Sequence, residues 1–220
     1  MALLNRIFLI TALALFATVS YAESSLPQAS HDGLQLQKGT KMRAVYMKPG
    51  ADLSEFSEVA LLEAYVAFKK HWKREYNENV VSLDGRINDR DMKKIRDEVA
   101  REFNKVFTEV LTKGGHKMVS KGAEGVLIIR PAIVNLVVTA PDLMTAGMNQ
   151  TASASAGQMT LYMELFDGKT GDIISRVIDP EAAGNHFFQI RNSVTNKADA
   201  DRVFRRWAKL LNDHLSSINK

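Results

Sequence analysis

Residues 88–115 read NDRDMKKIRDEVAREFNKVFTEVLTKGG, and this stretch decides the fold. Its apolar side chains recur at three- and four-residue steps, which is the spacing of one face of an α-helix. Asn88 or Asp89 is suited to cap the first exposed N–H groups, and Gly114-Gly115 supplies a left-handed stop. A helix of about 25 residues is roughly 37 Å long, so only a sheet several strands wide covers its stripe. That stripe consists of Met92, Ile95, Val99, Phe103, Val106, Phe107, Val110 and Leu111.

Strand-like segments lie on both sides of this helix. Residues 58–68 (EVALLEAYVAF) favour a strand, although their Leu and Ala content also permits a helix. Asp167-Gly168 and Gly171 make a tight turn between two segments rich in β-forming residues, which predicts a β-hairpin. The predicted strands cover residues 42–47, 58–68, 126–139, 158–166 and 173–178.

A second amphipathic helix closes the chain. Trp207 lies in the middle of its apolar stripe, so we expect this indole to be buried against the sheet. We expect His214, on the same stripe, to be a packed and hydrogen-bonded side chain. The pattern predicts one domain over residues 41–220, of the α/β (α+β) class. Its architecture is predicted to be a single layer of mainly antiparallel sheet with two long amphipathic helices packed on one face.

Two segments show no periodicity and are predicted to be flexible. Residues 23–40 are polar, which predicts a leader that precedes the domain. Residues 140–157 are rich in Ala, Ser, Thr and Gly, which predicts a mobile loop between two long strands.

Residues 1–22 have the features of an export signal. Arg6 gives a positive start, residues 7–19 are apolar, and Ser20-Tyr21-Ala22 places small residues at a cleavage site. Cleavage after Ala22 predicts a periplasmic protein with no transmembrane span, and an uncleaved N-terminal anchor is the alternative. The sequence contains no cysteine, so it has no lipid-acceptor cysteine at this site.

The composition excludes several classes of protein. The chain has 220 residues, of which 45% are hydrophobic and 25% charged, and these are globular proportions. With no cysteine, disulfide scaffolds, thiolate nucleophiles and Cys-ligated metal sites are excluded. The 29 basic and 25 acidic residues give a net charge of +4 without a concentrated basic face. We therefore expect no nucleic-acid partner.

The sequence contains no complete catalytic, metal-binding or cofactor-binding motif. There is no G-x-S-x-G, and the five histidines have no metal-binding spacing. Gly168-Lys169-Thr170 resembles the end of a phosphate-binding loop, but Met163 stands where the first glycine is required. Met144 and Met148 are more consistent with packing than with Cu(I) binding. We predict no catalytic residue, no metal site and no cofactor.

One local composition stands out as a candidate interaction patch. It combines four basic residues with a tryptophan: Lys69, Lys70, Trp72, Lys73 and Arg74. Such a cluster is able to dock on an anionic surface with the indole at the interface. The alternative, which we favour, is a solvated strand end with Trp72 folded back on the core.

Several stretches together resemble one known family. They read PGADLSEFSEVALLEAYVAFKKHWKREYN (49–77), VLIIRPAIVNLVVTAPDL (126–143), SAGQMTLYMELFDGKTGDIISRVIDPEAA (155–183) and FRRWAKLL (204–211). In this order they resemble the predicted bacterial lipoproteins known as domain of unknown function 3313. The resemblance implies that this is a protein of the cell envelope. It implies no activity, cofactor or site residue. Many relatives have a lipid-acceptor cysteine where this chain has Ala22-Glu23.

Together these observations favour a binding protein over an enzyme. We expect an exported, non-catalytic binding or interaction module in the periplasm, whose partner is an envelope protein or an anionic envelope surface. The alternative is a small-ligand carrier or an unrecognised enzyme, with a pocket between helices and sheet near residues 140–157.

Overall fold

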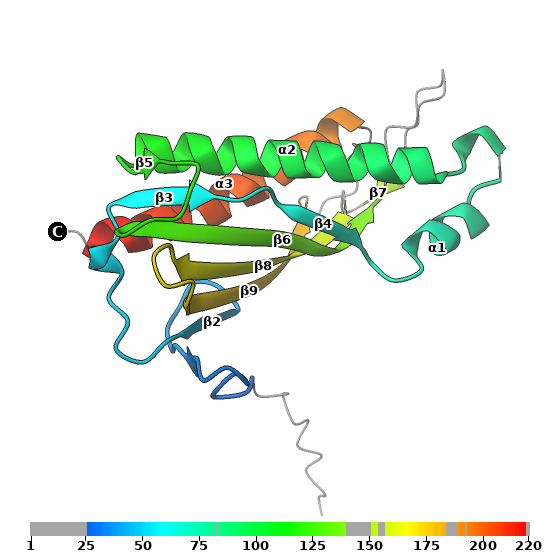
Figure 1. The fold of residues 1–220 in the computed structure, drawn as a ribbon. Coiled ribbons are helices and arrows are strands. Elements are labelled where there is room, and N and C mark those ends of the chain that lie inside the picture. The colour runs from blue at the N-terminus through cyan, green and yellow to red at the C-terminus, as the bar shows by residue number, and fades with distance from the viewer. Residues whose placement is uncertain are drawn as a thin grey trace, which may run out of the picture.

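The structure, a computed structural model, describes residues 26–81, 83–139, 151–153, 157–183, 189–191 and 193–218. The expected export signal and most of the loop expected over residues 140–157 lie outside the described residues. The mixed α+β class is confirmed, because three α-helices accompany an open eight-stranded sheet (Figure 1). Among the described residues we find no helix with the length and apolarity to cross a bilayer.

The sheet has the order β1-β2-β9-β8-β6-β3-β5, and β4 also pairs with β6. The hairpin of β8 and β9 lies at its centre, with its turn at the predicted position. A separate pair is formed by β7 (Thr151–Ser153) and β10 (Gln189–Arg191). The strands of the large sheet are β1 (Gln35–Leu36), β2 (Ala44–Met47), β3 (Glu58–Leu61), β4 (Tyr65–Phe68), β5 (Lys117–Met118), β6 (Val126–Val138), β8 (Gly157–Asp167) and β9 (Ile173–Ala183).

The sheet is mixed, with its parallel part on the β6 side. From β1 to β6 every pairing is antiparallel, whereas β3 and β4 run parallel to β6. Parallel neighbours need a crossover connection, and the chain makes it through α1 (Trp72–Glu78) and α2 (Asp89–Lys113). The short α1 was not anticipated in the sequence.

The single strand predicted over residues 58–68 is wrong in one respect. The segment forms two strands, which pair with successive parts of β6 and are separated at residues 62–64. Asn104 of α2 satisfies the backbone at this break: its side chain accepts from Ala64 N at 3.0 Å and donates to Leu62 O at 3.0 Å. One polar side chain therefore pairs a backbone donor and a backbone acceptor where the chain changes direction.

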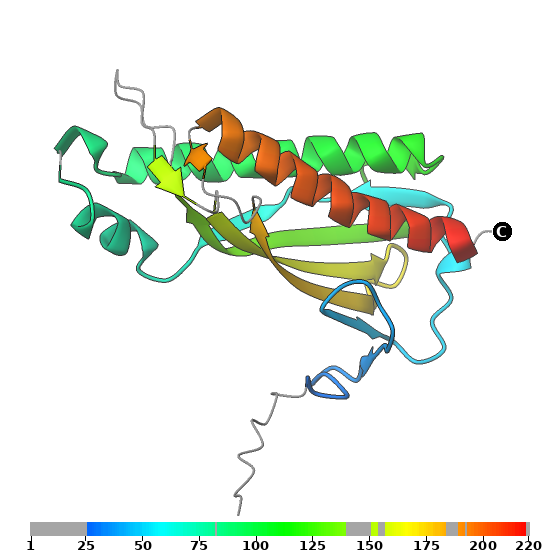
Figure 2. The same ribbon diagram turned by 180° about the vertical axis from the view of Figure 1, so that it is seen from behind.

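The two longer helices lie on the same face of the sheet, and α3 (Ser193–Ile218) crosses it diagonally (Figure 2). α2 begins where predicted, with Asn88 accepting from Asp91 N while Asp91 accepts from Asn88 N. The helices meet through Phe103 and Phe204, whose rings lie edge to face at 5.3 Å. Trp207 is fully buried, as predicted.

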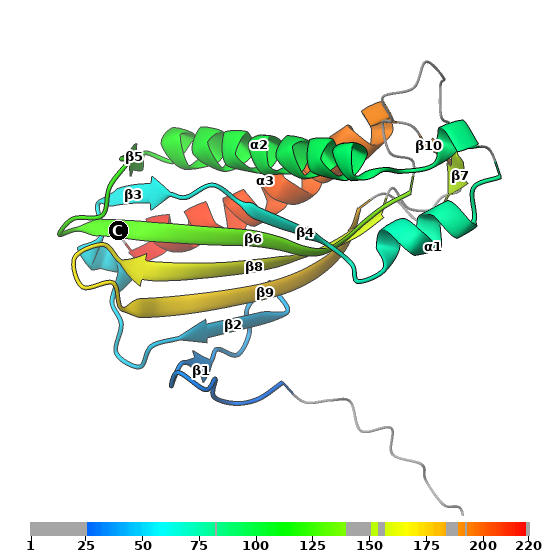
Figure 3. The same ribbon diagram turned by 45° about the vertical axis from the view of Figure 1, so that its right-hand side comes forward.

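The packed chain begins before residue 41, although a flexible leader was expected through residue 40. Leu34 is buried with Ala44 and Tyr46, and β1 pairs with β2 at the edge of the sheet (Figure 3). A two-residue strand is too short to produce a visible alternation of side chains, so the polar composition of its surroundings concealed it.

Candidate functional site

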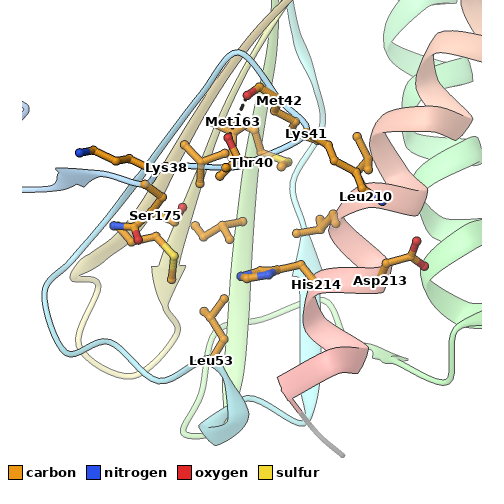
Figure 4. Close-up of a pocket in the computed structure, with 17 residues that line it drawn as sticks. Lys38, Thr40, Lys41, Met42, Leu53, Met163, Ser175, Leu210, Asp213 and His214 are labelled. Carbon is orange, nitrogen blue, oxygen red and sulfur yellow. Dashed lines mark hydrogen bonds between the residues drawn. The ribbon is translucent and has the colours of Figure 1, made fainter. Parts of the chain in front are cut away.

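A pocket lies between the helix-bearing face of the sheet and the C-terminal half of α3 (Figure 4). Its cavity volume is about 480 Å³, within the ~300–1,000 Å³ usual for small-molecule sites. The pocket is lined by Gln37, Lys38, Gly39, Thr40, Lys41, Met42, Val45, Met47, Leu53, Met163, Leu165, Ser175, Val177, Leu210, Leu211, Asp213 and His214.

The floor of this pocket consists of buried side chains of the central hairpin. Met163 and Leu165 of β8 face the helices together with Val177 of β9, because alternate residues of a strand share one face. Leu53, in the 3₁₀ turn η1 (Leu53–Glu55), and Leu211 of α3 complete the walls. The diagonal path of α3 brings its C-terminal half over this part of the sheet.

The rim is formed by the loop of residues 37–42, which connects β1 to β2. Gln37 N donates to Val45 O at 2.8 Å, and Thr40 Oγ1 donates to Met42 O at 2.9 Å. Gly39 has a φ of 73°, a conformation that costs glycine little. These features fold the loop back on β2, beside α3 (Figure 2).

Three methionines give the pocket an adaptable lining. Met42, Met47 and Met163 come from the loop, from β2 and from β8, and all three line the same cavity. Methionine is unbranched and has three rotatable bonds, so it adjusts to ligands of different shape. None of the described residues of the lining is a phenylalanine, tyrosine or tryptophan.

His214 differs from the expectation of a packed side chain. It is exposed, lines the pocket, and points from α3 toward the sheet (Figure 4). His214 lies at the edge of the apolar stripe, since the neighbouring Leu211 and Leu215 are buried in the core.

Ser175, Asp213 and His214 line one pocket but do not form a catalytic triad. Ser175 Oγ is buried and donates to the backbone oxygen of Tyr46 at 2.9 Å. Asp213 and His214 are adjacent on a helix, so their side chains diverge, and Figure 4 shows Asp213 pointing away from the cavity. The arrangement lacks the base–carboxylate contact of a nucleophilic hydrolase.

A charged network occupies the opposite face of the sheet. Glu164 of β8 stands between Arg130 of β6 and Arg176 of β9 in the strand register. Arg176 Nε donates to Glu164 at 3.0 Å, and Arg130 Nε donates to it at 3.1 Å. Tyr162 OH donates to the same carboxylate at 3.0 Å, and Arg176 Nη1 donates to Asp32 at 3.0 Å. The network ties the N-terminal segment to the sheet.

The two carboxylates of this network are held in their ionised form. Hydrogen bonds from Arg176 keep the pKa of Asp32 well below its usual range. Burial by itself raises the pKa of Glu164, but hydrogen bonds from Arg130, Arg176 and Tyr162 outweigh it and leave that pKa lowered. Each carboxylate thus stabilises the fold while charged.

Sequence reasoning missed this network. Counting back from the Asp167-Gly168 turn would place Glu164 opposite Ser175. A register shift between Leu165 and Phe166 instead places Arg176 opposite Glu164, where the opposite charges attract each other. The shift cannot be read from the sequence, so the pairing of these two residues was hidden.

A second polar cluster fixes α3 on the sheet. Asp179 accepts from Trp207 Nε1 at 2.8 Å, from Arg206 Nη2 at 2.6 Å and from Arg43 N at 2.8 Å. Glu181 accepts from Arg206 Nη1 at 2.6 Å. Asp179 and Glu181 both lie on β9, and both hold the last helix.

Comparison with known families identifies the chain. The family described as protein of unknown function (DUF3313) matches residues 26–211. The chain belongs to the DUF3313 family. Its stretches with Arg130-Pro131, the β8–β9 hairpin and Arg206-Trp207 all fall within the matched range, and here they supply the two polar networks.

Solved structures resemble this DUF3313 fold only distantly. The PelC dodecamer from Paraburkholderia phytofirmans has a TM-score of 0.38 at 10% identity, over 76% of this chain and 96% of that chain. A neuraminyllactose-binding hemagglutinin homolog from Helicobacter pylori has a TM-score of 0.34 at 11% identity, over 74% and 90% of the two chains. No curated protein matches the sequence.

In this DUF3313 chain the basic cluster lies on α1 and in the turn before it. Trp72 is only 4% exposed and stacks on Phe68, with ring centroids 4.4 Å apart. Three of the four cations have carboxylate partners, while Lys70 is exposed. These pairs are Lys69–Glu75 at 3.2 Å, Lys73–Asp89 at 2.6 Å and Arg74–Glu78 at 3.6 Å.

The described residues contain no group of three His, Asp or Glu side chains placed to hold a metal ion. Near the start of β8 the structure has a hollow of about 410 Å³ lined by Lys69, Asn135, Gln158, Met159, Thr160, Pro180 and Glu181. The alternative pocket was expected near residues 140–157, most of which lie outside the described residues. The apolar pocket lies toward the other end of α3.

Proposed function

We propose that this protein is a non-catalytic binding module of the bacterial cell envelope, exported to the periplasm, which holds an apolar ligand group in the pocket beneath α3. The supporting observation is the pocket itself. Aliphatic and thioether side chains line it on the sheet side, and leucines line it on the helix side. Its polar groups lie on the rim loop and on α3, apart from Ser175, whose hydroxyl is bonded to the backbone of Tyr46.

Burial of apolar surface favours binding in this pocket. A ligand group that leaves water for this pocket gains on the order of 25 cal/mol per Å² of apolar area. The same wall offers no acid–base pair, because Ser175 is held by Tyr46 and Asp213 points outward. The geometry therefore favours holding a ligand over transforming it.

The basic cluster of α1 contributes little to this proposal. Its Trp72 is enclosed by Phe68 and Tyr76, so the indole does not reach an interface. Binding of an anionic surface there would need to compete with Glu75, Asp89 and Glu78 for the three paired cations.

A neutral fluorescent probe tests the proposal. N-phenyl-1-naphthylamine gains fluorescence in apolar sites, and we expect saturable binding of one molecule per chain. Met47→Trp should remove this binding, since the larger side chain occupies the cavity. The matched control is Met118→Trp, because Met118 is another half-buried methionine of the same sheet but lies outside the pocket.

Melting temperatures of both variants show whether each is folded. Probe binding that is unchanged in a folded Met47→Trp variant would refute the pocket as the binding site. Absence of saturable binding in the wild-type protein would refute the proposed function itself.

A further inference from the structure

The rim of the pocket carries positive charge that the described part of the chain does not neutralise. Lys38 and Lys41 lie on the rim loop, and neither forms an ion pair with a described carboxylate. Other lysines of the same sheet edge are paired, such as Lys48 with Asp172 at 3.0 Å. Asp213 is the acidic residue of the lining, and it points away from the cavity (Figure 4).

The interior suits a flexible aliphatic chain better than a ring. Nucleobases are usually held by stacking on aromatic side chains, and the part of the lining that the structure describes has no phenylalanine, tyrosine or tryptophan. Met42, Met47 and Met163 instead offer a surface that conforms to a chain with many rotamers. Valine and leucine side chains make up the rest of the apolar wall.

The size of the cavity is consistent with one such chain. At roughly 30 Å³ for a group as large as a water molecule, about 480 Å³ holds on the order of 16 groups. A single long acyl chain contains about this number of groups, and the cavity has too little room for two such chains.

We infer that the pocket binds a single-chain anionic amphiphile, with its aliphatic tail among the three methionines and its carboxylate or phosphate head at Lys38 and Lys41. This inference rests on the proposed function and adds the chemical class of the ligand. Figure 4 shows Lys41 reaching from the loop toward Leu210 of α3 and Lys38 directed outward. The head therefore stays partly hydrated, and its contacts are those of exposed charges.

Displacement of the neutral probe measures the preference for an anion. Dodecanoate, dodecylamine and dodecyl maltoside carry the same chain with a negative, a positive and an uncharged head. We expect dodecanoate to displace N-phenyl-1-naphthylamine at about tenfold lower concentration than the other two, below its micellar range. Added lauroyl-lysophosphatidylglycerol separates a lipid source from a free fatty acid, because only a site that admits a phosphate diester with glycerol accepts it.

Charge removal tests the role of the two lysines. The double variant Lys38→Gln/Lys41→Gln should bind dodecanoate about tenfold more weakly and the neutral probe equally well, since two exposed charge contacts give an effect of this size. The matched control Lys69→Gln/Lys70→Gln, at the opposite end of the molecule, should leave both affinities unchanged. Raising the salt concentration should weaken dodecanoate binding to wild-type protein and spare the probe.

The outcomes separate the inference from the proposed function. Equal displacement by the three amphiphiles, or an unchanged dodecanoate affinity in the double variant, would overturn the anionic ligand while probe binding keeps the pocket as a binding site. Absence of probe binding by the wild-type protein would overturn both the inference and the proposed function.

Discussion

Replacing Trp207 by alanine should remove a large share of the stability of the domain. The indole is fully buried between α3 and the sheet, and its Nε1 donates to Asp179 at 2.8 Å. A tryptophan of this kind buries on the order of 200 Å², which at about 25 cal/mol per Å² corresponds to about 5 kcal/mol. Truncations of this type typically cost ~3–5 kcal/mol, against a total of ~5–15 kcal/mol for a domain.

Urea denaturation followed by circular dichroism measures this loss. Trp207→Phe keeps most of the apolar contact and removes the N–H donor, so we expect a smaller loss of about 1–3 kcal/mol. Tyr65→Ala is the matched control, because this aromatic side chain is 66% exposed and should change the free energy of unfolding by no more than about 0.5 kcal/mol. A Trp207→Ala protein within about 1 kcal/mol of wild type would refute the docking of α3 described here.

Three further predictions concern the loss of stability at low pH, the break between β3 and β4, and cleavage of the N-terminal signal. The pKa values of Asp32 and Glu164 are lowered in the folded state, so both carboxylates contribute fully to the free energy of unfolding above their ordinary pKa values. This contribution is lost as the pH falls below about 4, and thermal melts should show the decline. The decline should be smaller in Glu164→Gln. Asn104→Ala should cost about 1–3 kcal/mol in a urea melt, because it leaves Ala64 N and Leu62 O unpaired, and an unchanged midpoint would show that water replaces the amide. Mass spectrometry of the exported protein should find Glu23 at its N-terminus without an acyl chain, whereas a retained residue 1 would contradict cleavage.

The sequence was most informative where one periodicity extended over many residues. The stripe from Met92 to Leu111 and the cap at Asn88 specify α2, and the Asp167-Gly168 turn specifies the hairpin, because each signal is local and repeated. The division of residues 58–68 into β3 and β4 depends on Asn104, some forty positions away. A contact between residues so far apart in the sequence does not alter the residue pattern of the strand itself.

The candidate site was less accessible to sequence reasoning for a similar reason. Its methionines come from residues 42, 47 and 163, and only the pairing of β2 with β9 and β9 with β8 brings them together. The basic cluster at residues 69–74 was conspicuous because its residues are consecutive, yet the fold pairs three of its charges and buries its tryptophan. Consecutive residues made the composition of the basic cluster easy to recognise. The pocket could be recognised only once the register of the sheet was known.

The central claim is that an apolar ligand group enters the pocket lined by Met42, Met47 and Met163. Methyl-¹³C methionine NMR tests it most directly, because each methionine methyl reports on its own surroundings. On titration with N-phenyl-1-naphthylamine, the resonances of these three residues should shift together and saturate, while those of Met92 and Met118, outside the pocket, should stay in place. Unmoved pocket methionines, or equal shifts at Met92 and Met118, would contradict the account.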